Sequence, residues 1–286
     1  MGTLALKENA LGFELHADHQ LIAFYRTSEE LPRSESPKPC FAPLYTPSGK
    51  LITEYRPADH AWHTGLYFGW VHVNDANLWG GPWYLPEKEK YEYVDHSHGV
   101  QRHDRFAVFA VDDGIVSVDE ELSWLDPTDQ PMASESRSFR VSNVEGGYRY
   151  LISTRIEPTG DKLTMGASRA ARYSGLVLRM GPPFADAAHY CSEGRQGHEN
   201  IMGQRARWVG ARSACGGFVA MMDHPQNPRH PITWFTRKNL LGAGLLMEED
   251  LELTRGEALE LHYAFFVLDE DPGAEALEVL YTDFAG

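Results

Sequence analysis

The 286-residue sequence has few cysteines and no long hydrophobic segment. Its three cysteines, Cys40, Cys191 and Cys215, are far apart and form no CxxC pair, which argues against a disulfide framework and indicates reduced thiols. No run of about 18 apolar residues is present, so we expect no transmembrane helix. The N-terminal MGTLALKENALGF also lacks the features of a signal peptide, and we therefore expect a cytoplasmic protein.

Positive charge is also scarce. The chain has 26 Lys and Arg against 41 Asp and Glu, a net charge of -15, and no basic cluster offsets it locally. We therefore expect no nucleic-acid or membrane partner. The motifs GxGxxG, GxxxxGK[ST], HExxH and GxSxG are absent, which removes the usual support for nicotinamide, phosphate-loop, zincin and α/β-hydrolase chemistry. A neutral, hydroxyl-rich small molecule fits this composition better.

Short segments that alternate apolar and polar residues make up most of the chain. They include LGFELHA, RFAVFAVDDGIVSVDEEL, SFRVSN, YRYLISTRIEP, GFVAMMD and LELTRGEALELHYAFFVL. A period of two with Gly, Pro, Asn and Asp between the segments predicts half-buried antiparallel strands joined by hairpins. The clearest helical segment is the C-terminal PGAEALEVLYTDFA. These patterns predict an all-β antiparallel sandwich or supersandwich with a short C-terminal helix.

The domain organisation follows from length and composition. A hydrophobic fraction of 42% over 286 residues is enough for one large core, and no repeat or low-complexity tract divides the chain. Residues 28–39 are polar and rich in proline, which predicts an exposed loop too short to separate two cores. We expect residues 1–286 to form a single β-sandwich domain.

A proline-rich segment, MMDHPQNPRHPITWF, has an unusual spacing. In a polyproline-like conformation, three prolines would share one edge and His224, Asn227 and His230 another. Stiff prolines would limit the entropy lost when a ligand binds to that polar edge, beside Trp234. Asp223 would orient His224. The alternative is a proline-rich crossover between strands whose histidines are structural.

A second segment, residues 55–84, combines histidines with many aromatic residues. Rings cover the C–H faces of a sugar while polar groups bind its hydroxyls, so this composition indicates a carbohydrate site. His60 and His63 lie at i and i+3 in a loop, where one metal ion or substrate can reach both. Within LYFGWVHV, Phe68 and Trp70 fit a core strand instead.

Three further candidates lie elsewhere in the chain. Glu199, in a glycine-rich and charged segment, would serve as a general base if it were partly buried, and is otherwise part of a solvated loop. Arg179 ends an apolar strand, where its guanidinium could bind a hydroxyl or carboxylate pair. His98 is a secondary metal candidate in HSHGVQRH.

The segments FAPLYTPSGKLIT, RPADHAWHTGLYFGW, VNDANLW and MMDHPQNPRHPITWF resemble the PmoA-like family of bacterial proteins of unknown function, often labelled methane oxygenase PmoA. The resemblance runs from about residue 40 to the terminal YTDFA. It implies a β-sandwich protein, often encoded near sugar-oxidising dehydrogenases. A subunit of particulate methane monooxygenase must span a membrane, so we do not expect methane oxidation.

We therefore expect a carbohydrate-active enzyme on a supersandwich similar to the galactose mutarotase fold, an epimerase, isomerase or lyase that acts on a sugar or keto-sugar by acid–base chemistry. The expected catalytic residues are His63, His224 and Glu199. The expected substrate-binding residues are His60, Asp59, Arg179, Asp223, Asn227, His230 and Trp234. A divalent metal, with His60, His63 and His98 as candidate ligands, and a homodimer are left open. The alternatives are a non-catalytic carbohydrate-binding protein and a scaffold with structural histidines.

Overall fold

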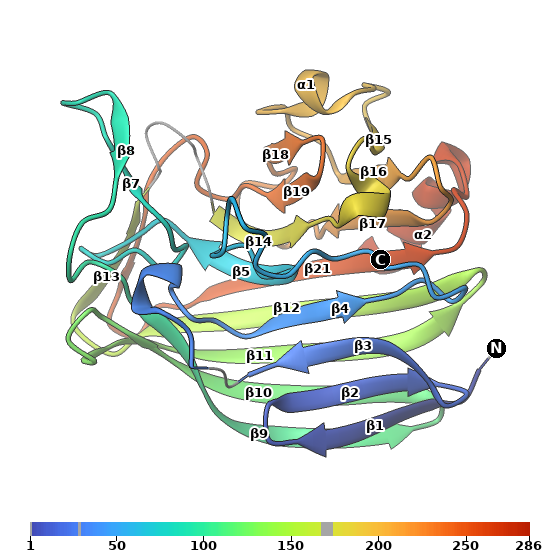
Figure 1. Cartoon of the computed structure of the whole chain (residues 1–286), viewed down its shortest axis with the longest axis horizontal. Coiled ribbons are helices and arrows are strands. Elements are labelled where there is room, and N and C mark those ends of the chain that lie inside the picture. Colours follow the sequence, from blue (N-terminus) through green and yellow to red (C-terminus); the bar gives the residue numbers. More distant parts are fainter. Residues whose placement is uncertain (1, 28–29, 167–173) are drawn as a thin grey trace.

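Two large antiparallel β-sheets form the body of the protein (Figure 1). The computed structural model describes residues 2–27, 30–166 and 174–286. Within these ranges, each large sheet has eight strands. The first has the order β1 (Leu4–Asn9), β2 (Gly12–Ala17), β3 (Gln20–Arg26), β4 (Cys40–Leu44), β5 (Leu66–Trp70), β14 (Ser174–Arg179), β19 (Leu240–Ala243) and β18 (Trp234–Arg237). The second has the order β15 (Ala188–Cys191), β16 (Trp208–Arg212), β17 (Phe218–Asp223), β21 (Leu259–Leu268), β12 (Gly147–Pro158), β11 (Pro131–Val144), β10 (Ile115–Leu125) and β9 (Val100–Asp112).

Smaller elements extend beyond the two sheets. A three-stranded sheet contains β20 (Leu251–Thr254), β13 (Lys162–Gly166) and β6 (His72–Val73), and a hairpin contains β7 (Trp83–Leu85) and β8 (Lys90–Glu92). Two α-helices, α1 (His198–Ile201) and α2 (Ala274–Ala285), lie in the described part of the chain together with 3₁₀ turns at Arg33–Glu35 and Pro182–Phe184. None of the described helices is long and apolar enough to cross a membrane.

The inner faces of the two sheets pack against each other through large apolar side chains. Phe41 of β4 contacts Phe139 of β11 with 5.0 Å between ring centroids, and Trp70 of β5 contacts Trp124 of β10 at 5.9 Å. Along β10, buried residues alternate with more exposed ones, which is the predicted period of two. The predicted all-β antiparallel sandwich with a short C-terminal helix is therefore confirmed.

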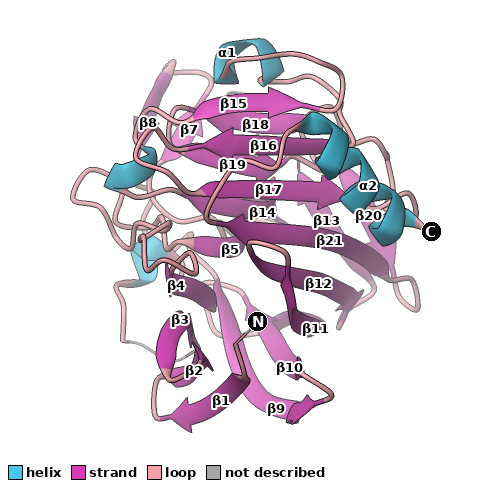
Figure 2. Ribbon diagram, turned by 90° about the vertical axis from the view of Figure 1, so that its right-hand side faces the viewer, coloured by secondary structure: helices cyan, strands magenta, loops and turns pink. Residues whose placement is uncertain are grey.

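The C-terminal helix covers the outer face of the second sheet (Figure 2). Leu277 and Tyr281, four residues apart on α2, are its buried side chains. They pack on Trp208 of β16 and Phe266 of β21. The helix thus gives outward-facing apolar residues of these strands a second buried layer.

The interior also contains charged residues at positions where the strand pattern places side chains inward. Arg137 of β11 is fully buried, and its Nε donates to Glu135 Oε1 at 2.7 Å. Glu135 also accepts hydrogen bonds from Trp124 Nε1 and Thr154 Oγ1, each at 2.7 Å. These bonds offset the cost of burying both charges between the sheets.

The expectation of an exposed loop over residues 28–39 is wrong for much of its described part. Glu35, Ser36 and Lys38 are buried. The Lys38 ammonium donates to the backbone carbonyls of Glu35, Ser36 and Trp79 at 3.1, 3.0 and 2.9 Å. The segment is held because its cation satisfies carbonyls that would otherwise be buried without partners.

Candidate active-site cleft

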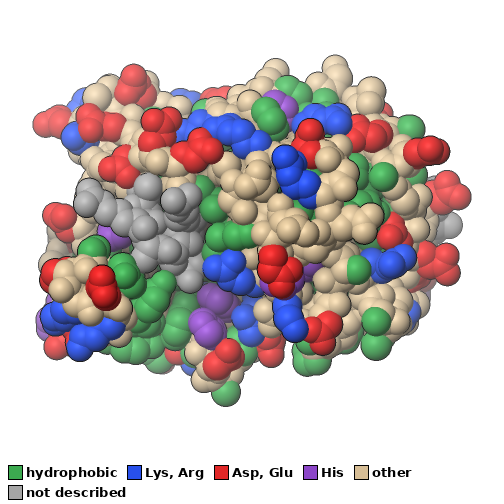
Figure 3. Space-filling view, turned by 90° about the horizontal axis from the view of Figure 1, so that it is seen from above, with side chains coloured by type: hydrophobic (Ala, Val, Ile, Leu, Met, Phe, Trp, Pro, Cys, Tyr) green, Lys and Arg blue, Asp and Glu red, His purple; other side chains and the backbone are tan. Residues whose placement is uncertain are grey.

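A cleft of about 980 Å³ opens where the end of the first sheet meets the smaller elements. Its walls come from the loop at residues 60–63, the segment after β5, the β7–β8 hairpin, β13 and the β18–β19 hairpin. Histidine and hydrophobic side chains lie together on this face of the molecule (Figure 3). The aromatic residues that line the cleft are Trp62, Trp79, Tyr84, Tyr91 and Phe235.

Two consecutive turns before β5 bring His60 and His63 together. The amide of His60 donates to Pro57 O at 3.0 Å, and the amide of His63 donates to His60 O at 2.9 Å. As a result, the two imidazoles stack with 4.9 Å between their centroids, and both line the cleft. This is the proximity predicted from their i and i+3 spacing.

His60 forms a pair with the carboxylate that precedes it. Its Nδ1 lies 2.8 Å from Asp59 Oδ2. The hydrogen bond from His60 holds the pKa of Asp59 below its usual value, so the carboxylate is ionised and accepts the proton on Nδ1. This contact fixes the imidazole tautomer and leaves Nε2 available to exchange a proton.

His63 lies deeper in the same wall, with only 6% of its surface exposed. Burial, together with the charges of His60 and Arg179, lowers the pKa of His63 well below its usual value. Its ring meets Trp79 edge-on at 5.8 Å. Among the described residues, its buried Nδ1 has no hydrogen-bond partner. His63 is therefore a neutral imidazole at pH 7.

Arg179, at the end of β14, adds a cation beside these histidines. Its Nε donates to Glu54 Oε2 at 3.0 Å, and its Nη2 lies 3.9 Å from Asp59 Oδ1. The residue is 9% exposed and lines the cleft. The sequence placed Arg179 at a strand end, and the structure brings it next to the Asp59–His60 pair.

Glu199 reaches the cleft only through His198. The Nε2 of His198, which lines the cleft, is 3.0 Å from Glu199 Oε1. The Glu199 side chain is 73% exposed, so it does not meet the expected condition of partial burial for a general base. Helix α1 is joined to β18 because Thr236 Oγ1 donates to His198 O at 2.6 Å.

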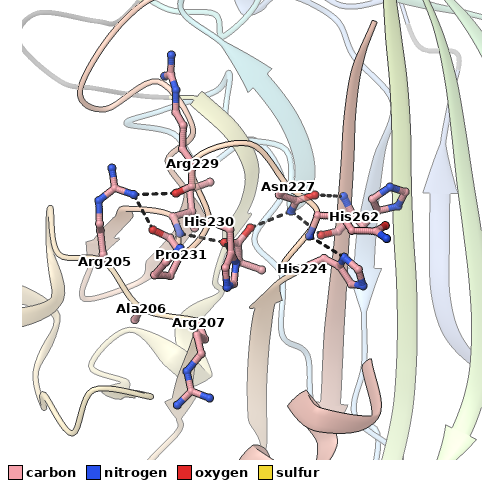
Figure 4. Close-up of polar contacts among 12 residues, drawn as sticks. Arg205, Ala206, Arg207, His224, Asn227, Arg229, His230, Pro231 and His262 are labelled. Carbon is pink, nitrogen blue, oxygen red and sulfur yellow. Dashed lines mark hydrogen bonds and ion pairs between the residues drawn. The ribbon is translucent and has the colours of Figure 1, made fainter. Parts of the chain in front are cut away.

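The proline-rich segment has a different organisation from the one expected (Figure 4). Buried Asp223 accepts hydrogen bonds from Asn227 Nδ2 at 2.8 Å, His230 Nδ1 at 2.7 Å and the amide of Ile232 at 2.9 Å. The backbone N–H of Asn227 donates to the backbone carbonyl of His224, so the chain turns here instead of following a polyproline helix. The polar side chains organise the loop itself.

The structure does not bring this loop together with the histidines of the cleft. Asp223, His224, Asn227, His230 and Trp234 are absent from the cleft lining. Trp234 is fully buried and its Nε1 donates to Ala206 O at 2.8 Å, so it offers no stacking surface. His224 packs against Phe284 of α2 with 4.9 Å between centroids. The expected single site that combines both segments is corrected to a cleft and a separate, internally bonded loop.

Of the three candidate metal ligands, His98 is separated from His60 and His63. His98 is buried, outside the cleft lining, and its Nε2 lies 2.7 Å from Gly81 O, which makes it a donor to a carbonyl instead of a metal ligand. His60 and His63 remain adjacent. Over the described ranges, no three His, Cys, Asp or Glu side chains converge as a metal site would require.

Sequence reasoning missed several residues of the cleft. Arg237, Lys238 and Asn239 line it from the β18–β19 hairpin, directly after the proline-rich segment. In β18, Phe235 and Arg237 line the cleft, while Trp234 is buried on the other side. The alternation in WFTR indicated that Phe235 and Arg237 share one face of the strand, but it could not show which face lies toward the His60 loop.

Comparisons with known proteins concern the family and the fold. The sequence model of DUF6807, a family of unknown function, matches residues 12–282 of this chain. A search of curated proteins found no match. Among solved structures, the chain is similar to a mutant of heparan sulfate lyase HepC from Pedobacter heparinus, with 9% identity and a TM-score of 0.32 over 91% of this chain and 30% of that one. It is also similar to Slr1438 from Synechocystis sp. PCC 6803, with 10% identity and a TM-score of 0.41 over 94% and 97% of the two chains.

A third similar structure is the polysaccharide lyase BACCELL_00875, with 11% identity and a TM-score of 0.30 over 91% of this chain and 34% of that one. This chain thus spans about a third of the length of the two lyases, 30% and 34%.

Proposed function

The chain belongs to the DUF6807 family of unknown function, and we propose that it is an enzyme that acts on a sugar or keto-sugar by acid–base chemistry in the cleft described above. A volume of about 980 Å³ suits a ligand of oligosaccharide size. Aromatic rings cover the C–H faces of such a ligand, and the Asn and His side chains of the lining bind its hydroxyls.

The observation that carries the proposal is the Asp59–His60 pair at this aromatic cleft. We assign His60 as the general base. Asp59 orients the imidazole and stabilises the imidazolium that forms when Nε2 takes a proton. The proton would come from a sugar hydroxyl or from the carbon beside a carbonyl. His63, which the sequence suggested as one of three catalytic residues, is neutral and has a low pKa, so it suits hydrogen bonding better than proton abstraction.

Removal of a proton beside a carbonyl places negative charge on the carbonyl oxygen. Arg179 and neutral His63 lie next to His60 and would stabilise that charge by hydrogen bonding. His198, with Glu199 behind it, would return a proton to the product. The scheme serves an isomerase, an epimerase or a lyase, because all three begin with the same proton transfer.

Deuterium exchange tests the assignment of His60. The protein is incubated in D₂O with a panel of aldoses, ketoses and 3-keto-glycosides, and NMR follows deuterium uptake at the carbon beside the carbonyl. We expect uptake with wild type and a loss of at least about 100-fold in His60→Gln, the usual contribution of a general base. Asp59→Asn should also slow exchange because it removes the carboxylate that orients His60.

His19→Asn is the matched control. His19 is exposed in the turn between β2 and β3, with a φ of 69° that Asn tolerates. The His19→Asn variant should therefore catalyse deuterium exchange into the sugar at the wild-type rate. Exchange that persists in His60→Gln contradicts the assignment. Sugar binding without exchange in the wild type supports the second candidate, a carbohydrate-binding protein without turnover.

A further inference from the structure

The cleft gathers cations in a protein whose net charge is -15. Of the described residues that line it, Arg179, Arg237 and Lys238 are Lys or Arg, while Asp250 is the one Asp or Glu. Over the whole chain, Asp and Glu outnumber Lys and Arg by 41 to 26. Basic residues therefore outnumber acidic ones in the cleft lining, the reverse of the whole chain. This charge differs from the neutral ligand that the overall composition favoured.

The three cations differ in how their charges are balanced. Arg179 is paired with Glu54 at 3.0 Å, and Lys238 with Asp186 at 3.1 Å. Among the described residues, Arg237 forms no ion pair. Its Nη1 donates to the carbonyl oxygen of Thr236 at 3.1 Å. Arg237 therefore brings an uncompensated positive charge to the cleft.

The position of Arg237 is set by β18. Phe235 and Arg237 lie two residues apart, on the same face of the strand. The guanidinium carbon lies 4.9 Å from the centroid of the Phe235 ring, and both side chains line the cleft. This stacking restricts the long side chain before a ligand binds, so that less entropy is lost on binding.

We infer that the substrate is an acidic carbohydrate and that the guanidinium of Arg237 binds its carboxylate. This inference rests on the proposed function, because it names the class of sugar that the same cleft accepts. The planar guanidinium matches a carboxylate through two parallel N–H···O bonds, which a neutral hydroxyl cannot provide.

Titration calorimetry with matched ligands tests the inference. The probes are oligogalacturonides and oligoglucuronides, their methyl esters, which lack the charge, and the neutral oligosaccharides of galactose and glucose. Oligosaccharides that carry sulfate or phosphate in place of carboxylate show whether the cleft selects the planar group or any anion. We expect the free acids to bind about tenfold or more tightly than their esters, as for a charge-assisted hydrogen bond.

Arg237→Gln should reduce this ratio to near one, chiefly by weakening the binding of the free acids. Arg237→Lys, which keeps the charge and loses the fork, should give an intermediate ratio. Arg155→Gln is the control because Arg155 is a surface residue of β12 paired with Glu157 and Glu260. Circular dichroism confirms that each variant is folded.

Several outcomes overturn the inference. Esters or neutral sugars that bind as tightly as free acids would refute it and leave the proposed function standing. An unchanged ratio of acid to ester affinity in Arg237→Gln would refute the assignment of Arg237 as the binding residue. Tighter binding of sugars that carry sulfate or phosphate would refute the assignment of a carboxylate as the bound group. If no sugar of any kind binds, the proposed function fails together with the inference.

Discussion

Asp223→Ala distinguishes a structural role of the proline-rich loop from a role in ligand binding. Asp223 is fully buried and accepts three hydrogen bonds. In the variant, the buried amide of Ile232 loses its partner, whereas Asn227 keeps its bond to His262 O and His230 retains some exposure. An unsatisfied buried donor costs about 1–3 kcal/mol, and each lost bond to a charged group adds to this.

Removal of Asp223 also relieves the cost of burying its carboxylate, since burial raises the pKa of Asp223. We therefore expect the free energy of unfolding to fall by about 2–4 kcal/mol, less than the sum of the three bonds. Urea unfolding at pH 7, followed by far-UV circular dichroism, measures this change. Asp161→Ala is the control, since the 95% exposed Asp161 forms a surface pair with Arg255 worth at most about 1 kcal/mol.

The same variant should keep the wild-type affinity for sugars, because residues 223–231 do not line the cleft. A variant of Asp223 that is as stable as wild type but has lost sugar binding would refute this reasoning. It would also restore the expectation that the loop carries the ligand site.

Two further predictions concern charge and pH. Because the folded state holds the pKa of His63 well below 6.5, the unfolded state binds more protons as the pH falls below about 6.5, and stability should fall with it. His63→Gln should lessen that loss by up to about 1.4 kcal/mol per pH unit in urea unfolding between pH 7 and 5; an unchanged slope would contradict the buried neutral imidazole. Arg137→Leu leaves the Glu135 carboxylate buried without its ion pair and should lower the free energy of unfolding by about 3–5 kcal/mol in the same assay at pH 7. Arg155→Leu, at an exposed position, should change the free energy of unfolding little. Equal effects of the two substitutions would contradict the role of the buried pair.

Much of the fold could be predicted from the sequence because strand periodicity records burial directly. Phe218–Asp223 and Leu259–Leu268 were expected as strands, and Ala274–Ala285 as the one clear helix. The buried polar segment around Lys38 was not predicted, because its burial depends in part on a hydrogen bond to the carbonyl of the distant Trp79. One domain over residues 1–286, a homodimer and a divalent metal stay predictions.

The candidate site was predictable only where it is local. His60 and His63 come together through two consecutive turns within residues 57–63, so their spacing was informative. Arg237 and His198 reach the cleft because β18 is at the edge of the first sheet and α1 is bonded to it, which no local pattern reveals. The proline-rich segment was wrongly predicted as part of the ligand site because Asp223, Asn227 and His230 form hydrogen bonds with one another inside the protein. In sequence, such a loop has the same pattern of polar residues and prolines as a loop that binds a ligand.

The role of the Asp59–His60 cleft is tested most directly by a crystal structure of the protein with the tightest-binding sugar from the calorimetric panel. We expect density for the sugar in the cleft, with a ring against Trp62 or Trp79 and a reacting carbon or hydroxyl within hydrogen-bonding reach of His60 Nε2. A sugar bound at the proline-rich loop, or elsewhere with the cleft empty, would contradict the claim that the Asp59–His60 cleft is the active site.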